Sequence, residues 1–213
     1  MNKYTKQVDK LQYNFKYVSL ERWNSYYAQI CEVIKFKKFK KKIKVLEIGV
    51  GTGILARELE NLGIDVTTID IDSELSPDIV ASITDMSIID NDSYDLVVAF
   101  EVLEHIQFMD ISKALLEMER VSRYGIIISV PNVYPYIMFG FKFPLVSVKY
   151  MLLNIPIKFK KDKFDGEHYW EIGRKNYSYK KIIQEMGKIK KFLIKNEYRL
   201  STCPFHHFII FKR

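Results

Sequence analysis

Three glycines follow one glutamate, Glu47, in a short stretch of the chain, Val45-Leu46-Glu47-Ile48-Gly49-Val50-Gly51-Thr52-Gly53. Glycine lets the backbone turn sharply and lie against a ligand without a Cβ in the way. The β-branched run 43–48 precedes these glycines and the helix-like sequence ILARELENLG follows them, so the loop joins a strand to a helix. Asp70 stands at the end of the next strand, where a carboxylate suits the hydroxyl groups of a ribose. The pattern predicts a binding loop for a ribose-containing ligand.

Two ligand classes compete for this loop. Gly51, Gly53 and Ala56 also satisfy the G-x-G-x-x-G/A form of a dinucleotide fingerprint. Glu47 separates the two interpretations, because a carboxylate just before the first glycine opposes a pyrophosphate. The same charge suits a ligand that carries an ammonium and a sulfonium.

A second constellation follows a later buried strand. Glu101, Glu104 and His105 are spaced i, i+3, i+4, and on a helical turn that spacing brings three side chains to one face. Two carboxylates and an imidazole there could bind a divalent cation, with His168 as the fourth ligand. Without a metal, His105 or His168 is the candidate general base.

The elements that must position these residues alternate along the chain. Strands are expected at Asp65–Ile71, Ile79–Ile83, Tyr94–Phe100 and Gly125–Val130, and the last two are nearly continuous apolar runs, as in a parallel sheet covered on both faces. Helices are expected at about 20–39, at 106–123 and at 179–188. A closing hairpin is expected over 192–200 and 207–211.

This alternation predicts an α/β fold, Rossmann-like and doubly wound, with a mostly parallel sheet of about seven strands of which the last is antiparallel. We expect a single domain over residues 1–213. Its predicted parts are an N-terminal helical cap (1–42), a cofactor-binding core (43–131), a lid insertion (132–165) and a C-terminal helix with the closing hairpin (166–213). The lid is expected because a segment rich in Tyr, Phe and Pro follows a strand at the ligand-binding edge.

The glycine stretch resembles the first motif of class I S-adenosylmethionine-dependent methyltransferases, E-x-G-x-G-x-G, at every defined position. The resemblance covers roughly Ile43 to Pro131. It implies that Asp70 holds the ribose hydroxyls and that Asp85 and Met86 frame the adenine. The cofactor-binding set that it implies is Glu47, Gly49, Gly51, Gly53, Asp70, Ile71, Asp85, Met86 and Phe100.

The string Glu101-Val102-Leu103-Glu104-His105, with the later Gly166-Glu167-His168-Tyr169-Trp170-Glu171, is similar to two branches of these enzymes. They are the ubiquinone-biosynthesis O-methyltransferases and the small-RNA 3′-end 2′-O-methyltransferases. The resemblance implies a metal (Mg, Mn, Fe or Zn) held by Glu101, Glu104, His105 and His168. The string also occurs in class I methyltransferases without a metal. Family members that methylate exocyclic amines of bases or glutamine amides usually carry Asn/Asp-Pro-Pro-Tyr/Phe after the fourth strand, and the stretch Phe100–Ile106 here lacks it, which disfavours that amine chemistry.

Composition bounds the partners. The chain has 33 Lys and Arg against 26 Asp and Glu, a net charge of +7, which allows an anionic partner. The leading hypothesis is an O-methyltransferase of a small molecule with an apolar part, with peripheral membrane contact through the aromatic lid. The alternatives are an RNA-terminal 2′-O-methyltransferase, favoured by the lysines of 158–163, and a non-catalytic partner protein.

Location and minor candidates complete the expectations. Two distant cysteines, no apolar leader and no membrane span indicate a cytoplasmic protein. Arg22, in the N-terminal helix, is a candidate for the cofactor carboxylate or a solvated helix arginine. His206 and His207 are adjacent in a strand and are expected to point to opposite faces as structural or surface residues.

Overall fold

The computed structural model describes residues 19–37, 42–145, 148–155, 157 and 166–213. Its core is a seven-stranded sheet of order β3-β2-β1-β4-β5-β9-β8. The strands are β1 (Lys44–Ile48), β2 (Asp65–Asp70), β3 (Ile79–Val80), β4 (Tyr94–Phe100), β5 (Ser122–Pro131), β8 (Leu193–Arg199) and β9 (His206–Lys212). Strands β1 to β5 pair in parallel, whereas β9 runs antiparallel to both β5 and β8. The predicted fold class, including the antiparallel end of the sheet, is confirmed.

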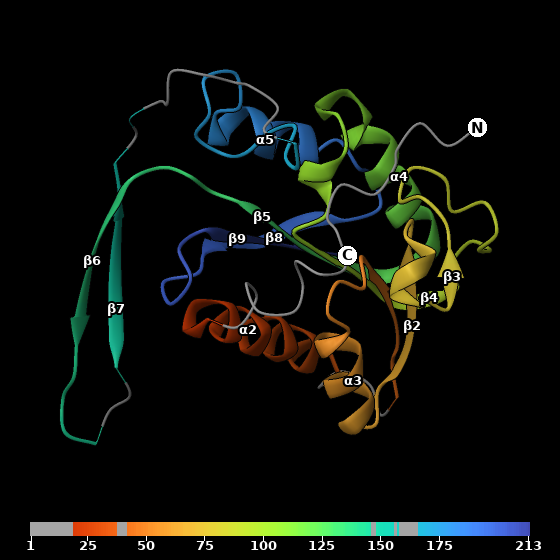
Figure 1. Ribbon diagram of the computed structural model, residues 1–213, viewed down its shortest axis with the longest axis horizontal. Coiled ribbons are helices and arrows are strands. Elements are labelled where there is room, and N and C mark those ends of the chain that lie inside the picture. Colours follow the sequence, from red (N-terminus) through yellow and green to blue (C-terminus); the bar gives the residue numbers. More distant parts are fainter. Residues whose placement is uncertain (1–18, 38–41, 146–147, 156, 158–165) are drawn as a thin grey trace.

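Helices cover both faces of this sheet. Helices α2 (Leu20–Lys37) and α3 (Ile54–Asn61) lie on one face, and α4 (Ile111–Val121) and α5 (Tyr179–Met186) lie on the other (Figure 1). Each face buries its own apolar core, one around Val33 and Leu59 and one around Leu115 and Met186. Because β4 is buried on both sides, it carries apolar residues without alternation.

Two predicted elements are shorter in the structure. The chain from 106 to 110 holds an extended Ile106 and the 3₁₀ turn Phe108–Asp110, so the regular helix begins only at Ile111. The strand predicted over 79–83 is reduced to two residues, Ile79 and Val80. In both cases, turns at the edge of the sheet replace regular structure.

The closing hairpin places its two histidines on opposite sides, as the strand period predicts. His206 is hydrogen-bonded to the Ser25 hydroxyl of α2 (2.7 Å), whereas the His207 ring packs against Tyr179 of α5. Both are buried, so they are structural rather than surface histidines. The two side chains point to opposite faces of β9, so His206 contacts a helix on one face of the sheet and His207 contacts a helix on the other.

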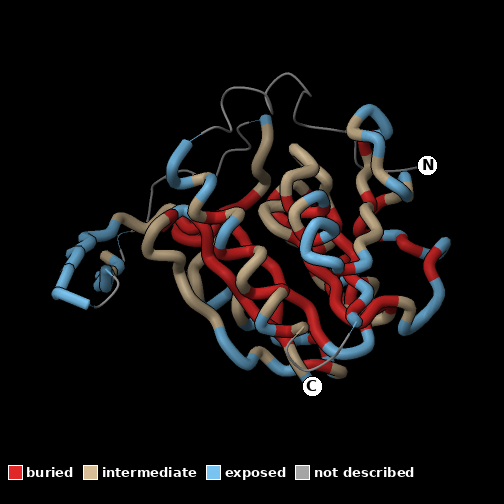
Figure 2. Tube along the Cα trace, turned by 90° about the horizontal axis from the view of Figure 1, so that it is seen from below, coloured by how far each residue is buried: buried red, intermediate tan, exposed pale blue. Residues whose placement is uncertain are grey.

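The aromatic insertion forms a separate two-stranded ribbon of β6 (Tyr136–Phe141) and β7 (Lys149–Asn154). It projects from the end of β5 away from the body of the protein (Figure 1), and Figure 2 draws it almost wholly as exposed. The expectation of a lid is therefore corrected for its described part, because side chains paired within a projecting ribbon do not reach the sheet edge. The lysine-rich end of the predicted lid, 158–165, lies outside the described residues.

None of the described helices is both long enough and apolar enough to cross a membrane.

Candidate active site

The glycine loop between β1 and α3 is shaped by three residues with positive φ. Gly49, Gly51 and Gly53 have φ of 85°, 52° and 68°, values that L side chains rarely adopt. Gly49 has a second constraint, because a Cβ there would lie 2.5 Å from Cγ2 of Val102. The backbone N–H of Gly49 donates to the Ile69 carbonyl (2.8 Å), which ties the loop to β2. The loop is thus held close to the sheet.

Asp70 closes the loop from the end of β2. Its Oδ2 accepts a hydrogen bond from the backbone N–H of Val50 (2.8 Å), and its Oδ1 accepts one from Asp72 (2.9 Å). Burial raises the pKa of Asp70, and these hydrogen bonds partly offset the rise. Each carboxylate oxygen can accept a further bond, so Asp70 can take ligand hydroxyls while it holds the loop.

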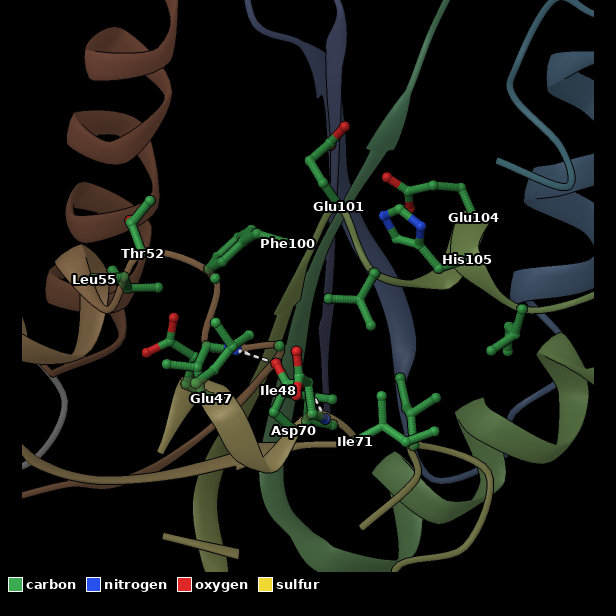
Figure 3. Close-up of a pocket in the computed structure, with 18 of the residues that line it drawn as sticks. Glu47, Ile48, Thr52, Leu55, Asp70, Ile71, Phe100, Glu101, Glu104 and His105 are labelled. Atoms are coloured by element: carbon green, nitrogen blue, oxygen red, sulfur yellow. Dashed lines mark hydrogen bonds between the residues drawn. The ribbon is translucent and has the colours of Figure 1, made fainter. Parts of the chain in front are cut away.

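A pocket opens at the carboxyl ends of the parallel strands, where open α/β sheets bind ligands (Figure 3). Ten of the residues predicted to bind the cofactor or a metal line it: Glu47, Gly49, Gly51, Asp70, Ile71, Phe100, Glu101, Glu104, His105 and His168. Gly53 lies outside the lining and caps the N-terminus of α3. The two constellations that are separate in the sequence therefore share one pocket.

Asp85 and Met86 do not line the pocket, and the expectation that they frame the adenine does not fit this geometry. The Asp85 side chain is exposed and accepts a hydrogen bond from the backbone of Ser87 (3.3 Å). Met86 is fully buried in the core. Ser82 and Ile83 line the pocket in their place, because the chain turns away directly after them.

Glu47 is buried against the loop and keeps one oxygen unsatisfied. Its side chain lies beside the pocket on the side of α3 (Figure 3), and Oε2 has no hydrogen-bond partner among the described residues. Burial raises the pKa of Glu47 to about 8. An orphaned carboxyl oxygen costs free energy unless a ligand donates to it. An ammonium group is such a donor, so the pocket fits S-adenosylmethionine at this point.

Glu104, His105 and His168 form a compact cluster on the opposite side of the pocket. One ligand atom of each lies within 4.8 Å of the others. Glu104 is fully buried, and neither of its carboxylate oxygens has a hydrogen-bond partner among the described residues. Burial, with a further contribution from Glu101, raises its pKa well above the ordinary value. A cation beside Glu104 would remove this cost, so the cluster fits a divalent metal.

The two histidines of the cluster are oriented by neighbours. Nδ1 of His105 donates to the Glu167 carbonyl (3.0 Å), and Nδ1 of His168 donates to Oε1 of Glu171 (2.8 Å). Both partners are pure acceptors, which assigns the proton to Nδ1 and the lone pair to Nε2 in each neutral ring. Glu171 is itself fixed by Arg174 (2.6 Å). Metal-binding histidines are oriented in this way by outer carboxylates and carbonyls.

Glu101 does not join this cluster. It has a φ of 56°, and the 3₁₀ turn Leu103–His105 follows it, so the helical turn that would place it beside Glu104 and His105 does not form. Its Oε1 accepts a hydrogen bond from the Ser129 hydroxyl (2.8 Å), and Glu101 is not part of the set of ligand atoms that lie within 4.8 Å of one another. Burial raises its pKa to about 7. The structure therefore brings together three of the four predicted ligands.

Helix α2 contributes a polar stripe that the sequence analysis used only in part. Arg22, Tyr26 and Gln29 line the pocket, and the Tyr26 hydroxyl is hydrogen-bonded to the Thr52 hydroxyl of the glycine loop (2.9 Å). Their i, i+4, i+7 spacing is the available signal, because it places all three on one helix face. Arg22, expected as a candidate, is on the pocket wall.

The fold and this site define a class of protein, the S-adenosylmethionine-dependent methyltransferases. Residues 46–129 match the family model described as a methyltransferase domain. The glycine loop and Asp70 suit either ligand class, but the buried Glu47 opposes the pyrophosphate of a dinucleotide. Together with the family match, this makes the chain a methyltransferase that uses S-adenosylmethionine. A sequence comparison with curated proteins finds no match.

Solved structures of low sequence identity share this fold. A protein of Pyrococcus horikoshii has a TM-score of 0.60 at 13% identity, with 96% of this chain and 99% of that chain covered. An S-adenosylmethionine-dependent methyltransferase of Aquifex aeolicus has 0.58 at 14%, covering 96% and 98%. The 1,6-didemethyltoxoflavin N1-methyltransferase of Burkholderia thailandensis, solved with 1,6-didemethyltoxoflavin and S-adenosylhomocysteine bound, has a TM-score of 0.57 at 11% identity, with 89% of this chain and 79% of that chain covered.

Proposed function

We propose that this chain methylates a hydroxyl oxygen of a small-molecule acceptor, and that Glu104, His105 and His168 hold a divalent cation beside that hydroxyl. The observation that carries the proposal is the buried, unsatisfied carboxylate of Glu104 next to two oriented imidazoles. A mixed nitrogen and oxygen set suits Mn²⁺, Fe²⁺ or Zn²⁺ at least as well as Mg²⁺. Glu101, the fourth ligand expected from the sequence, is left out of the set because it is bonded to Ser129.

The cofactor side of the proposal rests on the loop and on charges around it. When bound, S-adenosylmethionine supplies an electrophilic methyl group on a sulfonium. Asp70 accepts hydrogen bonds from the ribose hydroxyls, Glu47 accepts one from the ammonium, and Arg22 binds the carboxylate. Gly49 and Gly51 allow the backbone to approach the ligand. Ser82 and Ile83, which line the pocket, would contact the adenine in place of Asp85 and Met86.

On the acceptor side, the residues of the cluster prepare the hydroxyl. A cation held by Glu104, His105 and His168 would lower the pKa of a hydroxyl bound to it. In a metal-free enzyme, Nε2 of His105 or His168 accepts the hydroxyl proton instead, since a neutral imidazole is a suitable base near pH 7. Glu171 holds the His168 ring in either case. The pocket wall contributes by holding the acceptor oxygen in line with the methyl group.

The choice of a small acceptor is supported by the neighbours and by the pocket. Two of the similar structures are, by their names, N-methyltransferases of 1,6-didemethyltoxoflavin and of a glycopeptide. Oxygen is proposed here because no Asn/Asp-Pro-Pro-Tyr/Phe motif follows β4. Methylation of an RNA 3′ end remains the second outcome of the test.

The test measures metal binding and methyl transfer separately. Titration calorimetry with Mn²⁺ is expected to show one site in the wild type, a site lost in His168→Ala and kept in the control Asp85→Asn. Radiolabelled S-adenosylmethionine is then offered with a catechol, with an aromatic amine, and with a short RNA. Transfer to the catechol that EDTA abolishes supports the proposal. Transfer confined to the amine or the RNA rejects the acceptor class, and activity retained in EDTA rejects the metal.

A further inference from the structure

The ribbon of β6 and β7 exposes large apolar side chains that the body of the protein does not cover. Phe139, Phe141 and Phe143 are each exposed by 45% or more, and Leu145 near the tip is fully exposed. A two-stranded ribbon is marginal in water by itself, and contiguous exposed apolar surface of this kind marks an interaction site. None of the described ribbon residues lines the active-site pocket. The ribbon therefore needs a partner of its own.

The base of the ribbon is fixed to the sheet, so its outward direction belongs to the fold. Arg199 of β8 donates hydrogen bonds to the carbonyls of Asn132 (3.0 Å) and Tyr134 (2.8 Å) and to the side chain of Asn154 (2.5 Å). Its guanidinium also lies 4.8 Å from the ring centre of Tyr136. These contacts clamp both strands of the ribbon at one end, and the other end extends away from the body (Figure 1).

Both faces of the ribbon are apolar. Phe139 pairs with Met151 on one face, and on the other Met138 pairs with Leu152. Gly140 lies opposite Tyr150, whose ring packs across the same face. A protein partner docked on one face of the ribbon would leave the apolar side chains of the other face in water. A lipid layer that surrounds the tip would cover the apolar side chains of both faces.

The charged side chains in the sequence around the ribbon are all positive. No acidic residue occurs from 131 to 161, a stretch that contains five lysines. Two of them, Lys142 and Lys149, flank the tip of the ribbon, and Lys149 pairs with Phe141 across the strands. Aromatic and apolar side chains beside lysines are the composition that binds anionic lipid surfaces, where each lysine adds attraction to the headgroups.

We propose that the β6–β7 ribbon docks this protein on an anionic membrane surface, with its tip inserted among the lipid headgroups and upper acyl chains. The outer edges of β6 and β7 carry unpaired backbone N–H and C=O groups, which confines the tip to the hydrated interface. The ribbon continues β5, whose Ser129 contacts Glu101 in the pocket. Docking thus brings the pocket edge of the sheet toward the bilayer, where acceptors with an apolar part reside.

Vesicle co-sedimentation of the full chain tests this docking. Wild-type protein is expected to pellet with phosphatidylcholine–phosphatidylglycerol vesicles and at least about tenfold less with phosphatidylcholine alone, and high salt should release it. Phe143→Ser with Leu145→Asn removes two exposed apolar side chains, and asparagine suits the positive φ of Leu145 (63°). Binding is expected to fall about tenfold or more in this variant, and likewise in Lys142→Gln with Lys149→Gln.

The matched control is Ile88→Ser with Met109→Ser, which removes two equally exposed apolar side chains outside the ribbon. It should pellet like the wild type. Binding of S-adenosylhomocysteine should be the same in all variants, so loss of docking is separated from loss of the folded enzyme. Equal pelleting of the tip variant and the wild type overturns the proposal. So does a wild type that ignores anionic vesicles, or one that forms a dimer through the tip in place of lipid binding.

Discussion

Three carboxyl groups face one pocket, Glu47 and Glu104 buried and Glu101 partly buried, and each is held there at a cost. Burial raises the pKa of Glu47 to about 8 and that of Glu101 to about 7, and it also raises the pKa of Glu104 well above its ordinary value. Structural networks rarely retain several such groups in one place, whereas sites that bind cations or move protons do. The residues that define this site are therefore expected to destabilise the ligand-free protein.

Because burial raises the pKa of Glu47, the free energy of unfolding is expected to depend on pH. Its folded-state pKa of about 8 lies above the ordinary 4.5, so between these values the folded protein binds more protons than the unfolded chain. The free energy of unfolding attributable to Glu47 then falls as pH rises from about 5 to 8, by at most about 1.4 kcal/mol per pH unit. Urea denaturation at several pH values should show a weaker decline in Glu47→Gln. The exposed control Glu74→Gln should follow the wild type; matching slopes for Glu47→Gln and wild type would contradict the argument.

Asp70 and Asp85 make a matched pair for the cofactor. Asp70→Asn removes the negative charge that accepts hydrogen bonds from ribose, worth roughly 1.5–3 kcal/mol, so the affinity for S-adenosylhomocysteine should fall about 10- to 100-fold. Asp85→Asn should leave it unchanged, because that side chain is exposed and outside the pocket. Titration calorimetry measures both. A strong effect of Asp85→Asn would restore its sequence-predicted role at the adenine.

Among the elements, the glycine loop is the most tightly specified. Its shape depends on left-handed backbone at three positions, on the packing of Gly49 against Val102 and on the bond from Tyr26 to Thr52. These contacts come from α2, from β2 and from the chain after β4. The loop therefore depends on tertiary neighbours as much as on its own sequence.

Gly49→Ala tests the packing apart from the backbone. Gly49 and Gly63 both have positive φ, so alanine at either costs roughly 1–2 kcal/mol of stability. Only at Gly49 does the new Cβ meet another atom, at 2.5 Å from Val102, which adds about 1–3 kcal/mol. Chemical denaturation should rank Gly49→Ala below Gly63→Ala. Adding Val102→Ala should recover part of the difference, and a double variant no better than the single would exclude the clash as the cause.

At the scale of the whole molecule, the cofactor-binding loop and the cluster of Glu104, His105 and His168 lie on different sides of one pocket. The glycine loop belongs to the half of the sheet built from β1 and β2, and His168 comes from the chain that returns between β7 and α5. Folding must assemble both before either ligand can bind. Each ligand should therefore stabilise the entire protein and not only its own segment.

Thermal unfolding tests this coupling. A ligand at 100 times its Kd adds about 2.7 kcal/mol to the free energy of unfolding. S-adenosylhomocysteine should raise the Tm of both the wild type and His168→Ala, whereas Mn²⁺ should raise only that of the wild type. Equal shifts with Mn²⁺ in the two proteins would place the ion elsewhere.

The sequence by itself determined the sheet, its antiparallel end and the methyltransferase class, because these depend on local patterns. Apolar runs, the spacing of Glu47 and the three glycines, and Asp70 at the next strand end are all readable within a few residues of one another. The side of the strand on which each histidine of the closing hairpin lies is fixed by the period of the strand alone.

Tertiary structure alone decided the rest. A helical turn would unite Glu101 with Glu104, but the bond to Ser129 and the left-handed backbone at Glu101 separate them. His168 reaches the cluster through a return of the chain that no spacing encodes. The aromatic insertion became a projecting ribbon because Arg199, far along the sequence, clamps its base. Each outcome depends on contacts between residues distant in sequence, and local periodicity carries no information about them.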